Sequence, residues 1–293
     1  MQKATNKNKA IMFIVMSAFF FSLMTVFIRL SGDIPVFEKS FFRNLVAFLV
    51  AAVVLRKEKL PWFPNKSAMP PLIIRSITGT VGIIGNFYAV DHLQLADATI
   101  LNKLSPFFVI IFSVFILKER VTIFQICAVI VAFIGALFVI KPGVGLSSQF
   151  FASMVGVAGG LGAGIAYTMV RLCGKRGAKG PQIVFFFSGF SCLAVSPYIF
   201  FCYHPMAVLQ ISSLIMAGVC AAVAQFCITA AYSNAPAKEI SIYDYSQLIF
   251  AAIWGFVIFG NIPDHLSVIG YIIICGSSAA MFFYNNRKPS REG

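Results

Sequence analysis

The sequence contains few charged residues. They make up 11% of its 293 residues, against about 25% in a typical soluble domain. Apolar residues reach 59%, and 32 residues are Phe. A chain with so few charges cannot cover a folded surface with water-compatible groups, which excludes a soluble globular protein. The composition therefore predicts an integral membrane protein whose surroundings are the lipid bilayer.

The sequence also lacks the motifs of several enzyme and cofactor classes. It contains no ATP-binding P-loop, no CxxC motif and no metal-ligand spacing among its histidines. Its seven cysteines lie mostly within apolar runs, which is typical of small packing residues rather than disulfide or metal ligands. We therefore expect no cofactor and no metal, and energy from a gradient or from the substrate itself.

The net charge of +13 could suggest a nucleic-acid partner, but the basic residues lie between apolar runs and form no patch. Counted along alternating loops, nearly all of them fall on the side of the N-terminus: Lys3, Lys7, Lys9, Arg56, Lys57, Lys59, Lys66, Lys118, Arg120, Arg171, Lys175, Arg176, Lys179, Lys238, Arg287, Lys288 and Arg291. The opposite loops contain only Lys141. Cytoplasmic loops are the ones enriched in Lys and Arg. The pattern predicts a multi-pass protein of the plasma membrane (a bacterial inner membrane) with both termini in the cytoplasm, and no nucleic acid as partner.

Ten segments are long and apolar enough to span a bilayer, which needs about 20 residues of helix. They are 10–30, 36–55, 70–90, 96–117, 121–140, 151–172, 181–203, 209–233, 239–260 and 265–284. The fold class predicted is therefore an all-α integral membrane protein with ten transmembrane helices.

The two halves of the chain resemble each other. Shifted by 141 residues, Ala89 falls on Ala230, Ser105 on Ser246 and Gly135 on Gly276, and similar shifts align the first and second spans. Five spans per copy would place the second copy in the membrane upside down, an arrangement found in secondary transporters with a substrate site near the midplane. We predict two inverted five-helix repeats, residues 1–145 and 146–293.

The first half resembles the EamA-type family of the drug/metabolite transporter superfamily. The resemblance lies in PVFEKSFFRNLVAF (35–48), FYAVDHLQLADATILNKLSPFF (87–108) and LKERVT (117–122), which ends the fourth span near Glu119. It implies two inverted five-helix halves, a central cavity surrounded by spans 1–4 and 6–9, and transport of small organic metabolites. The second half departs from the pattern, with Gln247 at the counterpart of Pro106 and Asn261 near that of Glu119.

Polar residues inside the spans are the candidates for the site. Those predicted to line a substrate cavity are Ser22, Thr25, Asn86, Asn102, Lys103, Tyr167, Gln225, Tyr243, Asp244, Gln247 and Trp254. Arg43 and Arg75 are further charged candidates. Alternatives remain open: Ser and Thr in a span also bond to their own helix, and Asn or Gln can join two helices.

Lys103 and Asp244 occupy the same position of the two repeats. A charge within a span costs about 2.5–3.5 kcal/mol on insertion scales, so an inward-facing role is expected, with snorkelling of Lys103 to the headgroups as the alternative. Counting helical rise from the span ends places them about 10 Å apart along the membrane normal. We therefore expect two separate poles of one cavity, with Arg75 as a candidate partner of Asp244.

Four other charged residues are expected near Lys103: Asp97 and Glu38 as its acidic candidates, with Arg43 and Lys39 as competing cations. Pro106 predicts a bend that frees the carbonyl of Asn102, because proline has no N–H to donate. Gly160 and Gly164 continue a small-residue stripe that favours close helix packing, or sliding during gating.

These features favour a secondary transporter of small, amino-acid-like or amphoteric solutes by alternating access. Proton coupling through Asp244 is left open by the sequence. A passive channel or a non-transporting membrane scaffold is the first alternative. An intramembrane enzyme is the second, although no catalytic set of residues shares a helix face.

Overall fold

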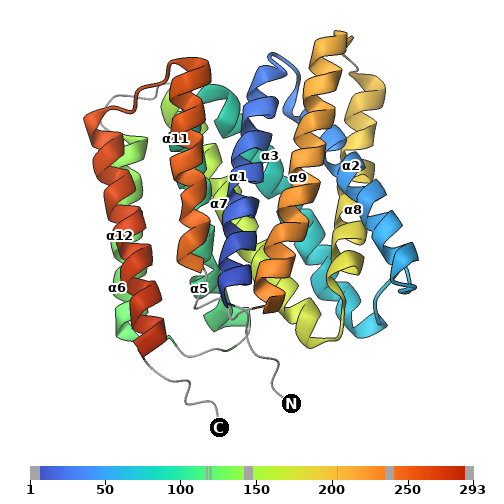
Figure 1. Ribbon diagram of the computed structural model, residues 1–293, viewed down its shortest axis with the longest axis horizontal. Helices are drawn as coiled ribbons and strands as arrows, with labels where there is room; N and C mark the ends of the chain where they lie inside the picture. The colour runs from blue at the N-terminus through green and yellow to red at the C-terminus, as the bar shows by residue number, and fades with distance from the viewer. Residues whose placement is uncertain are drawn as a thin grey trace.

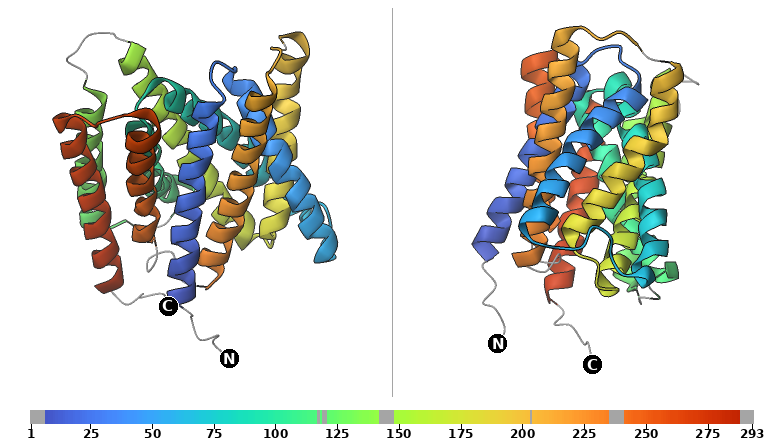
Figure 2. Two further views of the ribbon diagram at one scale, coloured as in Figure 1. Left: turned by 45° about the horizontal axis from the view of Figure 1, so that its top comes forward. Right: turned by 90° about the vertical axis from the view of Figure 1, so that its right-hand side faces the viewer.

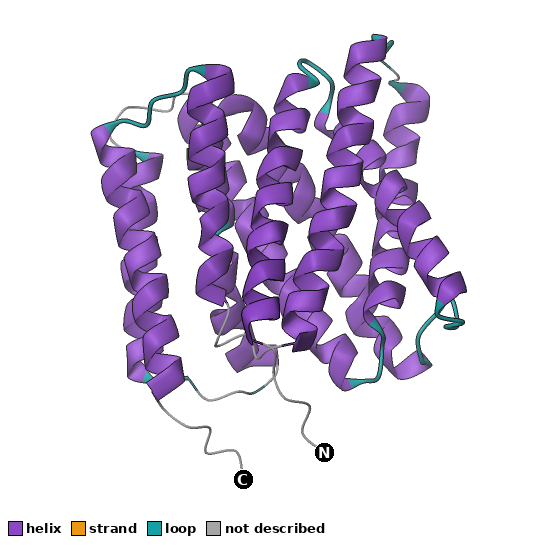
Figure 3. Ribbon diagram, in the orientation of Figure 1, coloured by secondary structure: helices purple, strands orange, loops and turns teal. Residues whose placement is uncertain are grey.

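The computed structural model describes residues 7–116, 118, 121–141, 148–202, 204–234 and 241–287, and within these ranges all regular structure is helical (Figure 3). In a bilayer each backbone N–H and C=O must find its partner within the protein, which long helices achieve along their own length. Eight helical stretches of the described residues are long and apolar enough to cross a membrane. The chain is therefore a multi-pass membrane protein.

The helices follow the ten predicted spans. They are α1 (Lys7–Leu30), α2 (Val36–Lys57), η1 (Lys66–Ala68), α3 (Met69–His92), α4 (Leu95–Asn102), α5 (Ser105–Ile116), α6 (Ile123–Ile140), α7 (Ser148–Lys175), α8 (Gly180–Phe201), α9 (Val208–Asn234), η3 (Ser241–Tyr245), α11 (Ser246–Phe259) and α12 (His265–Arg287). The ninth span has a shorter apolar helix than the others, Tyr243–Phe259. The second span, α2, is 22 residues long but carries Glu38, Lys39 and Arg43 in its first half.

The helices form a bundle in which partners come from opposite halves of the chain. α3 packs on α7, α1 on α9, α2 on α8, and α6 on α12. Figure 1 shows α6 and α12 together at one edge of the bundle, and the first residue of α1 and the last of α12 at the same end. Turned by 90°, α1, α9 and α11 lie toward one side and α3 and α7 toward the other (Figure 2).

Glycines set the closest of these contacts, between α3 and α7. A Cβ on Gly82 or Gly85 would lie 3.0–3.2 Å from backbone atoms of Gly159, and one on Gly162 would lie 2.8 Å from the carbonyl oxygen of Thr78. Only residues without a side chain allow two helix backbones to approach so closely. On α7 this contact is made by Gly159 and Gly162, which lie beside the stripe of Gly160 and Gly164 noted in the sequence.

The fourth span is interrupted, and the described part of the ninth span begins as a 3-10 helix. The fourth span ends as α4 at Asn102 and restarts as α5 at Ser105, and the ninth changes from the 3-10 helix η3 to α11 at Ser246. The α-helices α5 and α11 begin at Ser105 and Ser246, which the 141-residue shift of the sequence places on each other. The sequence predicted a single bent helix for span 4, and the structure has two helices instead.

Candidate functional site

An ion pair joins the interruption of span 4 to the 3-10 start of span 9. The ammonium nitrogen Nζ of Lys103 lies 2.5 Å from Oδ2 of Asp244, and their side chains are 9% and 15% exposed. The other carboxylate oxygen, Oδ1 of Asp244, is buried without a hydrogen-bond partner among the described residues. The prediction that these residues form separate poles was wrong, as was snorkelling of Lys103 to the headgroups.

The error came from treating both spans as straight helices. The backbone of Lys103 lies eight residues after the start of α4, or about 12 Å at helical rise, close to the middle of a hydrocarbon core of about 30 Å. The interruption of span 4 and the 3-10 start of span 9 then let each span deviate from the helix axis, and the four-carbon lysine stem adds its own length. Depth counted along the backbone therefore overestimated the distance between the charged groups.

The interruption of span 4 is held by a tyrosine of span 9. The hydroxyl of Tyr245 donates to the carbonyl oxygen of Lys103 at 3.0 Å. Pro106 is the second residue of α5, where a helix has no partner for its N–H groups, so its missing donor costs little there. Gln247 occupies the matching position of α11 and is 9% exposed, so α11 has no proline in its first turn.

Gly160 and Gly164 let α7 approach this interruption. A Cβ on Gly160 would lie 2.9 Å from the carbonyl oxygen of Leu101, and one on Gly164 would lie 2.4 Å from Cβ of Phe108. Both residues therefore pack against the start and the end of the break. Whether they also move during gating stays a prediction.

Two buried arginines lie around one phenylalanine ring. The guanidinium carbon of Arg75 is 3.6 Å from the ring centroid of Phe187, and that of Arg43 is 5.9 Å from it. The residues are 8% and 7% exposed. Arg75 is not the partner of Asp244, contrary to the sequence prediction, because its planar group stacks on Phe187 of α8 and Asp244 is already bound by Lys103.

Tyr167 connects the arginines with the ion pair. Its phenol interacts electrostatically with Asp244, Arg75 and Arg43. It lies seven residues after Gly160, on the same face of α7, toward the interruption in span 4. Although it faces the interior, 47% of its surface is accessible.

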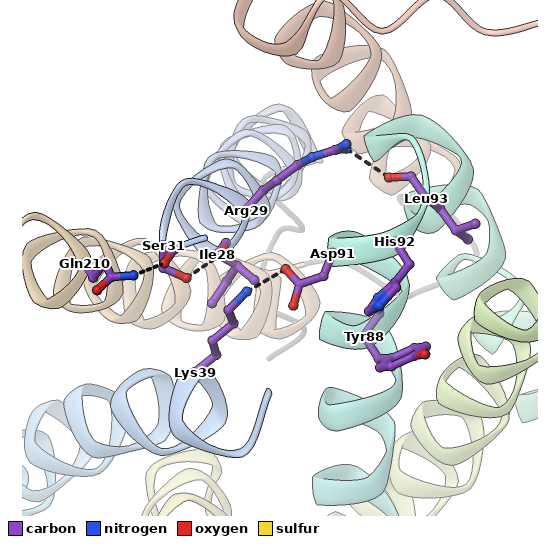
Figure 4. A network of polar contacts seen from close by, with 9 residues as sticks. All are labelled: Ile28, Arg29, Ser31, Lys39, Tyr88, Asp91, His92, Leu93 and Gln210. Carbon is purple, nitrogen blue, oxygen red and sulfur yellow. Dashed lines mark hydrogen bonds and ion pairs between the residues drawn. The ribbon is translucent and has the colours of Figure 1, made fainter. Parts of the chain in front are cut away.

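A second polar network closes the end of the bundle remote from the chain termini. Nζ of Lys39 lies 2.6 Å from Oδ1 of Asp91, and a guanidinium nitrogen of Arg29 donates to the carbonyl oxygen of Leu93 at 2.9 Å (Figure 4). The amide of Gln210 donates to the carbonyl oxygen of Ser31 at 3.1 Å. The network thus ties α1, α2, α3 and the start of α9 together.

The predicted acidic neighbours of Lys103 have other partners. Oε1 of Glu38 accepts the backbone N–H of His204 at 3.1 Å, and Oδ1 of Asp97 accepts the hydroxyl of Tyr271 at 2.6 Å. Lys39 is paired with Asp91 rather than competing at Lys103. These assignments were wrong because side chains on neighbouring helices, which sequence spacing does not reveal, were closer. Asp91 had no signal in the sequence beyond its position near a span end.

Three further candidates are joined by hydrogen bonds of their own. Nε1 of Trp254 donates to Oγ of Ser22 at 3.1 Å, and Ser22 donates to the carbonyl oxygen of Phe19. Thr25 donates to the carbonyl oxygen of Ser22. These contacts join α1 to α11 and follow the own-helix alternative. Their role as cavity lining stays a prediction.

The remaining candidates are spread around the same region. Asn102 is the last residue of α4, and its backbone lies against Gly160, while the backbone of Asn86 lies against Gly159. Gln225 is half-buried on α9. The ring of Tyr243 faces Phe282 of α12, with centroids 6.4 Å apart, so it points away from the arginines. Glu119 of the family motif lies outside the described residues.

A separate crevice of about 590 Å³ lies among α5, α6 and α7. Its lining is apolar and includes Ile111, Val129, Phe133 and Met154. It contains none of the candidate residues. Among the described residues, no three His, Cys, Asp or Glu side chains gather as a metal site.

Known proteins resemble this chain over nearly all of its length. It is 29% identical to the pseudopaline exporter CntI of Pseudomonas aeruginosa, covering 94% of this chain and 96% of that one. It is 24% identical to solute carrier family 35 member G1 of Homo sapiens, covering 94% and 80%. An uncharacterised transporter of Helicobacter pylori is 21% identical, covering 87% and 88%.

A solved crystal structure has the same fold, with a TM-score of 0.69 at 13% identity over 97% of this chain and 100% of that one. The model of the EamA-like transporter family matches residues 8–141, which contain Arg43, Arg75, Lys103 and Pro106. Over these residues the chain is similar to the EamA-like transporter family, and the relatives that resemble it over nearly its whole length are named as transporters or solute carriers.

Proposed function

We propose that this protein is a secondary transporter that moves small organic metabolites across the plasma membrane by alternating access. The observation that carries the proposal is the Lys103–Asp244 ion pair, which joins the interruption of span 4 to the 3-10 start of span 9 within the bundle. Breaks in helices at membrane depth occur where the backbone is enclosed by protein or lines a water-filled cavity. Transporters use such discontinuous helices at their substrate sites.

We further infer that residues 1–145 and 146–293 are inverted repeats. The helix pairing supports this: α3 packs on α7, and its repeat counterpart α9 packs on α1. The pairs α2 with α8 and α6 with α12 each join one span to its own counterpart. Under this symmetry, equivalent residues that touch each other lie on the axis relating the halves. Lys103 and Asp244 are such residues, and the axis would place them at the membrane midplane.

In this proposal the ion pair is the element that changes between the two access states. Asp244 retains one buried carboxylate oxygen without a partner, which can accept a proton or a donor group of the substrate. Protonation of Asp244 would remove the attraction to Lys103 and let α4 and α11 separate. This gives a concrete route for proton coupling, and the relative named as an exporter makes export the direction to test first.

The polar network of Figure 4 serves as the gate at the end remote from the termini. Lys39 is fully buried and its partner Asp91 comes from a different helix, so the two must separate if this end opens. We propose that this end faces outward, because the loops at the other end contain most of the lysines and arginines.

The orientation can be tested by cysteine labelling in a background without the native cysteines. Cys introduced at the exposed Glu58, in the loop after α2, should react only from the cytoplasm. Cys at the exposed Ile262, before α12, should react only from outside. If both positions react from the same side, Glu58 and Ile262 do not lie on opposite faces of the membrane, and the proposed orientation is wrong.

Flux into proteoliposomes tests the transport itself. Purified protein in liposomes should take up components of a metabolite mixture with saturation, and preloaded substrate should accelerate uptake, because a carrier returns faster when loaded. A channel would show neither saturation at low concentration nor this acceleration. An intramembrane enzyme would return a chemically altered metabolite, and a scaffold would give no flux.

A further inference from the structure

Arg43 and Arg75 differ from the other buried cations because they have no acidic partner. No carboxylate among the described residues lies within 4.0 Å of either guanidinium, whereas Lys39 and Lys103 each contact an aspartate. Nε of both arginines is buried without a hydrogen-bond partner in the described part of the chain. The cluster therefore holds two positive charges with unused donors.

The structure holds these two groups in place without using a negative charge. Arg75 lies flat against Phe187 in a slot that exists because residue 79 is glycine: a Cβ there would lie 2.2 Å from Nη1 of Arg75. Arg43 donates from Nη1 to Oδ1 of Asn44 at 2.7 Å, and the amide of Asn44 is itself anchored on the carbonyl oxygen of Ser40. Both guanidinium groups are thus oriented in advance.

This arrangement is costly unless an anion completes it. Each charge within a span carries an insertion cost, and the two arginines repel each other. A contact with an aromatic ring recovers only part of that cost. A planar guanidinium with free donors is the side chain that binds carboxylates in bidentate fashion. The site therefore has the chemistry of an oxyanion receptor.

We propose that Arg43 and Arg75 bind a carboxylate group of the transported substrate, which makes the substrate class an organic acid or a zwitterion. That the carboxylate belongs to a transported substrate rests on the proposed function. The anion site itself is argued from the geometry of the two arginines alone. Tyr167 is near enough to both arginines and to Asp244 to interact with them electrostatically, so the two clusters lie in the same region of the bundle. A donor group elsewhere on the substrate would then reach the free oxygen Oδ1 of Asp244.

Binding can be measured without transport. Protein in nanodiscs of neutral phosphatidylcholine is heated with acetate, succinate or citrate, each at constant ionic strength, and with the uncharged succinamide as the matched control. We expect at least one carboxylate, but not succinamide, to raise the unfolding temperature. Protection only in nanodiscs containing anionic lipid would assign the site to a lipid headgroup instead and overturn the proposal, as would equal protection by succinamide or none by any carboxylate.

Variants connect this protection to the two arginines. Arg43→Gln and Arg75→Gln should each weaken carboxylate affinity about tenfold or more, because a charge-assisted hydrogen bond is lost. Gly79→Ala keeps both charges but displaces the Arg75 guanidinium, so it should weaken binding even if a glutamine variant fails to fold. Arg56→Gln is the matched control, an exposed arginine near the Trp62 ring at 5.7 Å. Unchanged affinity in Gly79→Ala and in either glutamine variant would overturn the assignment.

The two proposals can fail separately. Carboxylate protection that depends on the arginines, with no flux of any carboxylate, would refute transport and leave the anion site standing. Saturable flux of neutral or cationic metabolites that is unaffected by Arg43→Gln and Arg75→Gln would leave transport standing and refute the organic-acid class.

Discussion

The two buried charge clusters of this protein differ in how their charges are compensated. Lys103 and Asp244 neutralise each other between span 4 and span 9. Arg43 and Arg75 lie together over Phe187 with no acid of the described residues in contact. Two opposite charges in contact compensate each other and hold helices together. Two like charges without an acid in contact are compensated only when an anion binds. The sign of a mutation's effect on stability should therefore differ between them.

Neutralising one member of the ion pair should have the largest effect. Lys103→Met leaves Asp244 buried and uncompensated, which we expect to destabilise the protein by about 3–5 kcal/mol, and Asp244→Asn should act similarly. The double variant should recover much of this stability, because no unpaired charge remains, but should lose transport. Unfolding of purified variants and flux in liposomes measure the two effects.

The charge swap sharpens that test. Since Lys103 and Asp244 are in direct contact, Lys103→Asp combined with Asp244→Lys should regain part of the stability lost by either single change. Separate poles would give no recovery. The absence of any recovery, together with stable single variants, would show that the contact is not formed in the membrane.

The packing of α7 on the interruption should have the next largest effect. Gly164→Ala places a Cβ 2.4 Å from Phe108 and should destabilise the protein by about 1–3 kcal/mol, as overpacking does. Gly174→Ala on the same helix is the matched control, because a Cβ there meets nothing within 4 Å. If the unfolding temperatures of the two variants agree, α7 does not pack against span 4 as closely as described.

Removing an arginine should have a smaller effect, of opposite sign to that of the ion pair. Arg75→Gln removes an uncompensated charge and a ring contact, and we expect the ligand-free protein to gain about 1 kcal/mol, since the cost of the charge exceeds the ring contact. Unfolding without added anions measures this. A loss of several kcal/mol would mean that Arg75 already has a compensating partner.

Pro106→Ala should affect turnover more than stability. The alanine N–H can bond to the carbonyl oxygen of Asn102 and join α4 to α5, which stiffens the interruption that the Lys103–Asp244 pair depends on. We expect slower transport at little-changed substrate affinity, measured as the maximum rate and the half-saturation concentration of flux. An unaltered maximum rate would make the proline a static feature of the helix start.

The exposed pair Lys141–Asp264 should have the smallest effect. Although burial alone would raise it, hydrogen bonds from Lys141 and Ser267 lower the pKa of Asp264 to about 2. A lowered pKa means that its contribution to stability is present above about pH 4 and is lost as the pH falls toward 2. Because the side chain of Asp264 is 49% exposed, we expect Asp264→Asn to cost less than about 1 kcal/mol at pH 7. A larger loss at pH 7 would mean that the contact of α6 with α12 depends on this pair.

The sequence was most informative where the relevant physics is local. Hydropathy identified the spans, because a bilayer selects length and apolar composition one helix at a time. The proline at position 106 predicted a bend where span 4 is interrupted. The 141-residue shift of the sequence aligned Lys103 with Asp244. The structure has two helices where a bend was predicted. The carbonyl oxygen of Lys103 accepts its hydrogen bond there from Tyr245, a residue 142 positions away in the sequence.

The partners of the buried charges were decided only by the tertiary structure. Lys39 with Asp91, Asp97 with Tyr271 and Arg75 over Phe187 are contacts between helices, and no spacing in the sequence specifies them. They depend on helix tilt, on the point where span 4 breaks and on glycines that let backbones approach. A long side chain in a low-dielectric bundle binds whichever group lies within its reach, and that reach is fixed only when the helices are packed.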